Sequence, residues 1–205
     1  MKWNQVITIG RQFGSGGHEI GERLAKDLGI PCYDRELIEM ASTTLGVDSY
    51  DLEQVDEGAL HKFLAAYKVP EKANPLTGYG LTLNDSLYLA QCNIIDTLAA
   101  EGPCVMIGRT AGEVLHNNPK CINVFIVANK ADRVKRIMER YHLSEREAAE
   151  AVRKVDRKRK FYFENYTETE WGKPESHAII LNVSKLGMGR VVEIIKGIYL
   201  QEQEK

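Results

Sequence analysis

Short apolar runs alternate with longer stretches of helical spacing along most of the chain. Residues 6–9 are rich in β-branched side chains and predict a strand, whereas residues 20–28 carry apolar side chains at helical spacing. Further buried strands are expected at residues 104–107, 123–128 and 178–183. Apolar strands separated by helices are typical of a parallel sheet covered on both faces. The pattern therefore predicts a three-layer α/β fold.

Local signals place several helix boundaries. Asp34 is expected to cap the helix that follows it. A long core helix is expected from about residue 84 to the Gly102-Pro103 pair, which ends it. Ser144 and Glu147 have the spacing of a capping box, so a second charged helix is expected to begin there.

The segment between the first strand and the first helix carries the most informative motif. Gly14, Gly16 and Gly17 lie just before a helix whose first N–H groups are unpaired and whose N-terminus carries about half a positive charge. Such a terminus suits a phosphate group. The usual phosphate-binding loop continues from its last glycine to Lys and then Ser or Thr, but here Gly17 and His18 stand in those places. The segment therefore predicts an anion site that lacks the customary lysine.

Two other interpretations of these glycines remain open at this stage. They would equally form a tight turn between strand and helix with no ligand. A dinucleotide-binding turn is disfavoured, because its third small residue would fall at Glu19, whose charge opposes a second phosphate.

Composition narrows the class of protein. With 205 residues, the chain fits one ordinary domain. Its 27 basic and 29 acidic residues give a net charge of -2, which creates no general attraction to nucleic acid or membrane. No apolar window is long enough to span a membrane and no signal peptide is evident, so we expect a cytoplasmic protein. Reduced, buried thiols are expected at the cysteines: Cys32, Cys92, Cys104 and Cys121.

Residues 130–160 are the most charged part of the chain. Arg153 and Arg157 are four residues apart and share a helix face, whereas Arg159 points elsewhere. Such a run is usually a solvated surface, but beside a phosphate-binding loop its arginines would neutralise a moving phosphoryl group, with Asp156 orienting an arginine or a substrate. Binding to nucleic acid is disfavoured, because the aromatic residues follow the cluster rather than interleave with it.

Taken in order, five segments resemble the cytidylate kinase family, and most closely its cytidylate kinase-like branch. They are the glycine loop, Tyr33-Asp34-Arg35, Ile107-Gly108-Arg109, the run from Asp132 to Arg136 and the run from Asp156 to Arg159. The resemblance covers nearly the whole chain. It implies a single nucleoside monophosphate kinase domain over residues 1–205, with a helical monophosphate-binding insertion at 35–85 and a lid-like helix pair at 130–165. It also implies transfer of the γ-phosphoryl group of ATP, with Mg²⁺, to CMP or dCMP.

The expected sites follow from the residues and from the resemblance. The resemblance implies that Gly14, Ser15, Gly16, Gly17, His18 and Glu19 hold the ATP phosphates, that Asp34, Arg35 and Arg109 lie at the acceptor, and that Arg153, Arg157 and Arg159 surround the transferring group. From the residues themselves, Arg11 is a candidate to replace the lysine, Asp156 to orient substrate, and Ser15 to bind the metal.

Two departures from the family pattern leave the function open. Gly17 replaces the lysine, and Ile107 and Thr110 replace the acidic residues that usually flank the Gly-Arg pair. The second change removes contacts to a cytidine base or sugar, so the acceptor is open. The alternative to a kinase is a nucleotide-binding sensor with weak or no turnover.

Overall fold

The computed structural model describes residues 4–44 and 83–203. Their strands form one sheet in the order β2-β3-β1-β4-β5, and every pairing in it is parallel. The carboxyl ends of the strands therefore meet at one edge of the sheet, where ligands collect in folds of this kind. The strands are β1 (Val6–Arg11), β2 (Cys32–Tyr33), β3 (Cys104–Ile107), β4 (Cys121–Val127) and β5 (Ile179–Asn182).

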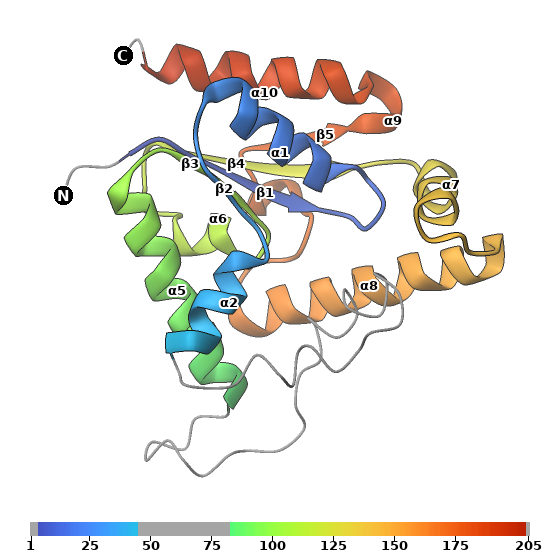
Figure 1. Ribbon diagram of the computed structural model, residues 1–205, viewed down its shortest axis with the longest axis horizontal. Coiled ribbons are helices and arrows are strands. Elements are labelled where there is room, and N and C mark those ends of the chain that lie inside the picture. The colour runs from blue at the N-terminus through green and yellow to red at the C-terminus, as the bar shows by residue number, and fades with distance from the viewer. Residues whose placement is uncertain (1–3, 45–82, 204–205) are drawn as a thin grey trace.

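Two helices, α1 (Gly17–Leu28) and α10 (Met188–Gln203), cover one face of the sheet (Figure 1). Ile20 and Leu24 of α1 are fully buried in the same cluster as Ile7 and Ile9 of β1. Burial of a side chain of this size contributes about 1.5–3 kcal/mol. The apolar face predicted for residues 20–28 is thus the face that α1 packs against the sheet.

The opposite face is covered by α2 (Glu36–Thr44), α5 (Leu83–Glu101) and α6 (Ala111–Val114) (Figure 1). A second core cluster lies between these helices and the sheet. Its fully buried large side chains are Val6, Leu37, Ile95 and Met106. The sheet is therefore apolar on both faces, and the predicted three-layer α/β architecture is confirmed.

A third cluster joins the helix pair α7 (Lys130–Tyr141) and α8 (Glu145–Tyr166). The capping box predicted at Ser144 and Glu147 is present at the start of α8. Phe13, from the segment after β1, is buried in this cluster together with Ile137 and Val152. The glycine segment is therefore anchored in the core of the helix pair.

Some boundaries differ from the sequence predictions. Asp34 does not cap the next helix, because α2 begins only at Glu36 and the Asp34 carboxylate is engaged elsewhere. The last strand ends at Asn182, whose side chain accepts a hydrogen bond from the Ser184 N–H and starts α9 (Val183–Leu186). The short α6 and the 3-10 turn at Pro174–Ser176 had no clear signal. Most of the expected insertion at 35–85 lies outside the described residues.

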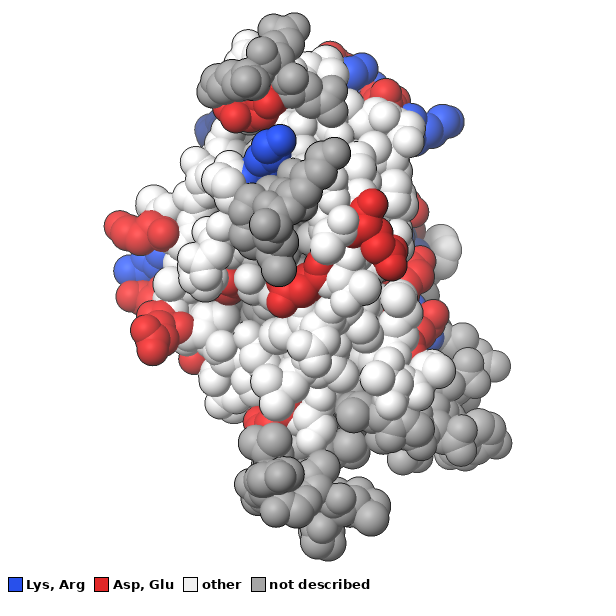
Figure 2. All heavy atoms as spheres, turned by 90° about the vertical axis from the view of Figure 1, so that its left-hand side faces the viewer, with Lys and Arg blue, Asp and Glu red and all other residues white. Residues whose placement is uncertain are grey.

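On the face drawn in Figure 2, basic side chains are scattered among acidic ones. Among the described residues, no helix combines the length and the apolar character that crossing a membrane requires.

Candidate active site

The segment from β1 to α1 makes a tight loop in which two glycines have positive φ. Gly14 has φ 76° and Gly16, at the N-cap of α1, has φ 88°. A Cβ on Gly14 would lie 2.8 Å from the Arg133 carbonyl oxygen. A side chain at either position would therefore be strained, and the loop passes close beneath α7.

Ser15 is fully buried within this loop. Its hydroxyl donates a hydrogen bond to the Gln12 carbonyl oxygen at 2.8 Å. The hydroxyl thus stabilises the turn, and its expected role as a metal ligand stays a prediction. Among the described residues, no group of three or more His, Cys, Asp or Glu side chains is placed to hold a metal ion.

Gly17 and Arg11 are in close contact. A Cβ at Gly17 would lie 2.7 Å from the Arg11 Cβ and 3.1 Å from its Cγ. The Arg11 side chain therefore fills the space in which a lysine at position 17 would begin. This packing is a physical reason for the glycine, and it makes Gly17→Lys a steric change as well as a change of charge.

Arg11 is the last residue of β1, and its side chain runs toward the end of β3. Its guanidinium donates to the Asp34 carboxylate at 3.0 Å and lies against Gly108, where any Cβ would overlap it. Arg11 is buried. It therefore braces the ends of β1, β2 and β3, while its Cβ and Cγ lie against Gly17 of the loop.

Asp34 lies between two cationic groups. Besides Arg11, its carboxylate contacts the His18 Nδ1 at 2.9 Å. Burial alone would raise the pKa of Asp34, but the charge of Arg11 and the hydrogen bond to His18 outweigh it and hold that pKa well below its ordinary value. The hydrogen bond to Asp34 raises the pKa of His18, against the effect of burial. The loop therefore favours a protonated imidazole at the start of α1.

Arg136 of α7 lies directly over Gly16. Its guanidinium occupies the place where a Cβ on Gly16 would be, and its Nη1 atom is buried with no hydrogen-bond partner among the described residues. Nearby, Arg140 donates to the Glu19 carboxylate at 2.6 Å. Sequence reasoning missed both arginines as site residues. Their four-residue spacing on a charged helix was the available signal.

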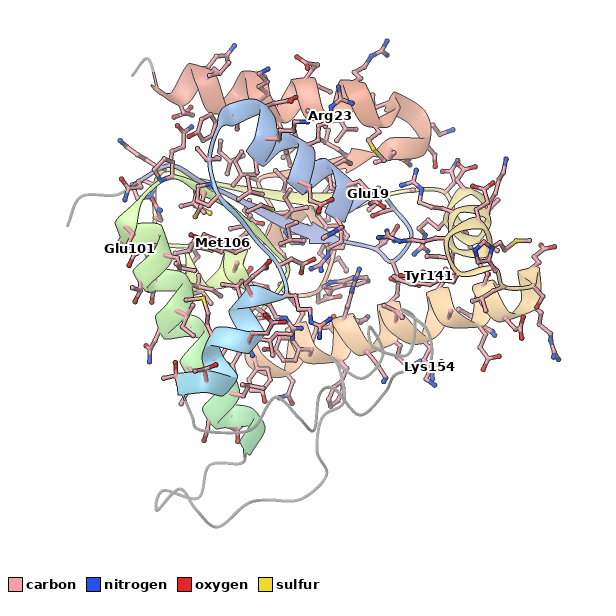
Figure 3. All side chains as sticks on the ribbon, viewed as in Figure 1. Glu19, Arg23, Glu101, Met106, Tyr141 and Lys154 are labelled. Carbon is pink, nitrogen blue, oxygen red and sulfur yellow. The ribbon has the colours of Figure 1, made fainter. Side chains whose placement is uncertain are left out.

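These groups line an open space that we call the loop cleft. In Figure 3, Glu19 of α1 and Tyr141 of α7 mark two of its sides. Its polar and glycine lining consists of Arg11, Gln12, Gly14, Gly16, Gly17, His18, Glu19, Asp34, Arg136, Arg140 and Arg159. The structure therefore brings the predicted phosphate-binding residues together, with Ser15 beneath them.

The arginines predicted on α8 divide into two groups. Arg159 is buried, donates to the Arg11 carbonyl oxygen at 2.9 Å and stacks over the Phe13 ring with its guanidinium carbon 5.8 Å from the centroid. Arg153 and Arg157 are exposed, and they line neither the loop cleft nor the neighbouring cavity that contains Arg109. Lys154, which neighbours Arg153, points away from the sheet in Figure 3. As expected, Arg159 lies on a different face of α8 from Arg153 and Arg157. Arg159 is buried beside the loop, whereas the other two are exposed.

Asp156 and Arg35, both expected at the acceptor, are engaged with other protein groups. Asp156 accepts hydrogen bonds from the Phe13 N–H at 2.7 Å and from Arg133 at 2.5 Å. It therefore orients an arginine, one of the two roles considered for it. Arg35 is exposed and forms an ion pair with Glu39 at 3.1 Å.

A second space lies beneath the sheet, and we call it the ring cavity. Its lining includes Arg109, which follows β3 and has φ 55°, and its neighbour Thr110, with φ 56°. Two adjacent non-glycine residues in the left-handed region are strained, which is frequent at functional sites. Arg11 and Arg159 line both the ring cavity and the loop cleft. Its aromatic lining consists of Phe125, Tyr162, Phe163, Trp171 and His177.

The loop, the parallel sheet and the arginine-bearing helix pair together define the fold of a P-loop kinase. Comparison with protein families agrees: residues 6–185 match the cytidylate kinase-like family, and the chain belongs to it. No curated protein matches the sequence.

Among solved structures, the chain is similar to an uncharacterized protein from Eubacterium ventriosum ATCC 27560. The two are 27% identical over 96% of this chain and 98% of that one, with a TM-score of 0.71. More distant likenesses show the fold alone. A shikimate kinase from Bacteroides thetaiotaomicron is 12% identical over 95% of this chain and 97% of its own, with a TM-score of 0.51. A gluconokinase from Sinorhizobium meliloti 1021 is 13% identical over 98% and 99%, with a TM-score of 0.50.

Proposed function

We propose that the protein is an ATP-dependent phosphotransferase acting on a small phosphorylated acceptor, of which a nucleoside monophosphate such as CMP is the first candidate. The observation that carries this proposal is the buried Nη1 of Arg136 above the start of α1. Membership in the cytidylate kinase-like family supports the reaction class.

The Arg136 guanidinium and the N-terminus of α1 place positive charge at one point, which a bound anion would compensate. A guanidinium nitrogen that is shielded from water and has no hydrogen-bond acceptor is costly in free energy. At Gly16 it faces the N-terminus of α1, which adds about half a positive charge of its own. An anion bound at this point would satisfy both groups, and triphosphate oxygens are acceptors of the right kind.

In this proposal, residues 14–19 and Arg136 hold the ATP phosphates. His18, whose pKa is raised by Asp34, adds positive charge at the helix start. Arg140 is already paired with Glu19 and connects α7 to α1 across the loop cleft. Mg²⁺ accompanies ATP in the proposal, with Ser15 retained as its candidate ligand. The γ-phosphoryl group is the group that ATP supplies.

Arg109 and Arg159 are the cations proposed to meet the acceptor, because both line the ring cavity next to the loop cleft. Asp34 contributes by holding Arg11 and His18 in place. Arg35 and Asp156 are proposed to act indirectly, since Arg35 is paired with Glu39 of α2 and Asp156 of α8 holds Arg133 of α7 and the Phe13 N–H. Arg153 and Arg157 are proposed as arginines that reach the transferring group when the helix pair closes over it.

An ADP-forming assay tests the proposed function. Purified protein with ATP and Mg²⁺ would be incubated with CMP, dCMP, UMP, AMP, GMP and several small alcohols. We expect ADP formation that depends on one acceptor, and Arg109→Ala should abolish use of that acceptor while ATP affinity stays within about twofold. ATP binding without ADP formation from any acceptor would contradict the proposal.

The second candidate is a nucleotide sensor, and the contact between Gly17 and Arg11 favours it. Because the Arg11 side chain takes the space next to Gly17, the loop is built without its customary lysine. A sensor would bind ATP in calorimetry, change conformation on binding, and release no ADP over many hours.

A further inference from the structure

The ring cavity has an aromatic wall of defined geometry. Phe125 of β4 packs edge-on against Trp171, with ring centroids 5.2 Å apart, and is stacked with His177 at 4.6 Å. A Cβ at Gly10 would lie 2.6 Å from the Phe125 ring, so the glycine leaves room for that ring beside β1. The wall is thus a set of rings held by packing, and it suits the flat face of a ligand ring.

A hydrogen-bond network beside this wall determines which nitrogen of His177 carries the proton. The Asn123 amide group donates to the Ser176 carbonyl oxygen at 3.0 Å, and its Oδ1 accepts from the Thr8 hydroxyl at 3.3 Å. The same Oδ1 lies 3.2 Å from the His177 Nδ1. Because this oxygen only accepts, Nδ1 must carry the hydrogen, and Nε2 of the neutral ring then has a free lone pair.

That lone pair is available at neutral pH. Burial lowers the pKa of His177 to about 4, so the ring is uncharged. Its Nε2 is buried and has no hydrogen-bond partner among the described residues. Buried polar atoms are nearly always satisfied in native proteins, by protein, water or ligand. Here the group that is missing is a hydrogen-bond donor.

We propose that the ring cavity binds the ring portion of the phosphoryl acceptor, and that His177 Nε2 selects a ring carrying an N–H or O–H donor at its edge. The anionic portion of the same molecule would lie by Arg109, which also lines the cavity. This inference rests on the proposed function and deepens it by naming the acceptor class: an uncharged, donor-bearing ring joined to an anionic group.

Trp171 gives a direct reading of the cavity that needs no turnover. The chain has two tryptophans, so Trp3→Phe leaves Trp171, in the wall, as its only tryptophan, whose emission can be excited selectively. Each ring with a donor would be compared with the same ring without it: adenosine against purine riboside, and cytidine against its 4-deamino analogue. Myo-inositol would test O–H donors, and inorganic phosphate would test the anion alone.

We expect saturable quenching by a donor-bearing ring, roughly tenfold weaker binding of its matched analogue, and no quenching by phosphate. His177→Phe keeps a ring in the wall but removes the lone pair, and should erase the preference between the members of a pair. His177→Gln restores an acceptor oxygen and should recover part of it.

Equal affinity for both members of each pair, or an unchanged preference in a folded His177→Phe protein, would overturn the inference. So would the absence of quenching by every ring probe. Because this assay contains no ATP, its failure leaves ATP binding and ADP formation to be judged separately. Conversely, quenching without ADP formation would retain the cavity as a ligand site and remove the phosphotransferase.

Discussion

The loop cleft is lined by charged groups from α1 and α7, whereas the ring cavity has an aromatic wall from β4, α8 and the segment before β5, beside Arg11, Arg109 and Arg159. Two buried nitrogens that have no hydrogen-bond partner among the described residues, one beside each space, are of opposite kinds. Arg136 offers a donor with a positive charge, and His177 offers a neutral lone pair. One space is therefore suited to an anion and the other to an uncharged ring, as expected for the two partners in a phosphoryl transfer.

Arg11 lines both spaces, and its removal should have the largest effect on the free energy of unfolding. Arg11→Met leaves the Asp34 carboxylate, whose side chain is 24% exposed, without its main partner. We expect a loss of about 3 kcal/mol in the free energy of unfolding, near the lower end for such pairs because His18 remains. Denaturant unfolding measures it. The exposed pair of Arg23 and Asp27 on α1 provides the control. Arg23→Met should cost less than about 1 kcal/mol, and an equal cost would show that Arg11 does not brace the strands.

Substitutions of glycine test whether the missing lysine has a steric cause. Gly17→Ala places a Cβ 2.7 Å from the Arg11 Cβ, and we expect it to cost about 1–3 kcal/mol of stability through overpacking. At Gly197, inside α10, nothing lies within 4 Å of an added Cβ. Gly197→Ala should therefore stabilise the protein by up to about 1 kcal/mol. Thermal unfolding of both variants decides the point, and similar stability for the two would remove the steric explanation.

A smaller effect, with a known sign, is expected for the pH dependence of stability and of ATP affinity, through His18 in the loop cleft. The folded pKa of His18 is raised above its ordinary value of 6.5. The stability gained from the protonated ring is therefore complete below that value and is lost as the pH rises through the folded pKa. ATP affinity should fall over the same pH range. Asp34 stays charged throughout it, because its pKa is lowered. Glu22 and Glu19 are the other acidic groups that raise the pKa of this ring.

The His18 ring can be followed by NMR titration, and the unfolding free energy by denaturant series at several pH values. In His18→Gln this part of the pH dependence should disappear. The same substitution at exposed His116 should leave it in place. A pH dependence unchanged in His18→Gln would assign the effect to another group.

Much of the fold follows from local patterns. The β-branched run at residues 6–9, the glycines after it and the capping box at Ser144 are short-range signals, and the structure has strand, loop and helix at these places. The position of Asp34 was predictable only in part. Its sequence neighbours suggested a helix cap, but tertiary contacts with Arg11 and His18 decide its partners.

The residues missed by sequence reasoning depend on contacts between distant segments. Arg136 matters because α7 crosses the loop at Gly16. Its spacing to Arg140 indicates a shared helix face but not what that face covers. His177 lies after a 3-10 turn without a clear signal, and its free nitrogen is defined by Asn123 on β4. Conversely, Arg153 and Arg157 have the right charge for a site, but their helix face is turned to solvent.

The affinity for ATP of an Arg136→Ala variant tests the central claim most directly. Calorimetric titration should show at least tenfold weaker binding than in the unsubstituted protein, because a charge-assisted hydrogen bond is lost. Stability without ATP should be unchanged or higher, since the Nη1 atom of Arg136 is buried with no hydrogen-bond partner among the described residues. Lys135→Ala removes an exposed charge from the neighbouring position of α7 and should change ATP affinity by less than about twofold. Equal ATP affinity in Arg136→Ala and the unsubstituted protein would contradict the account.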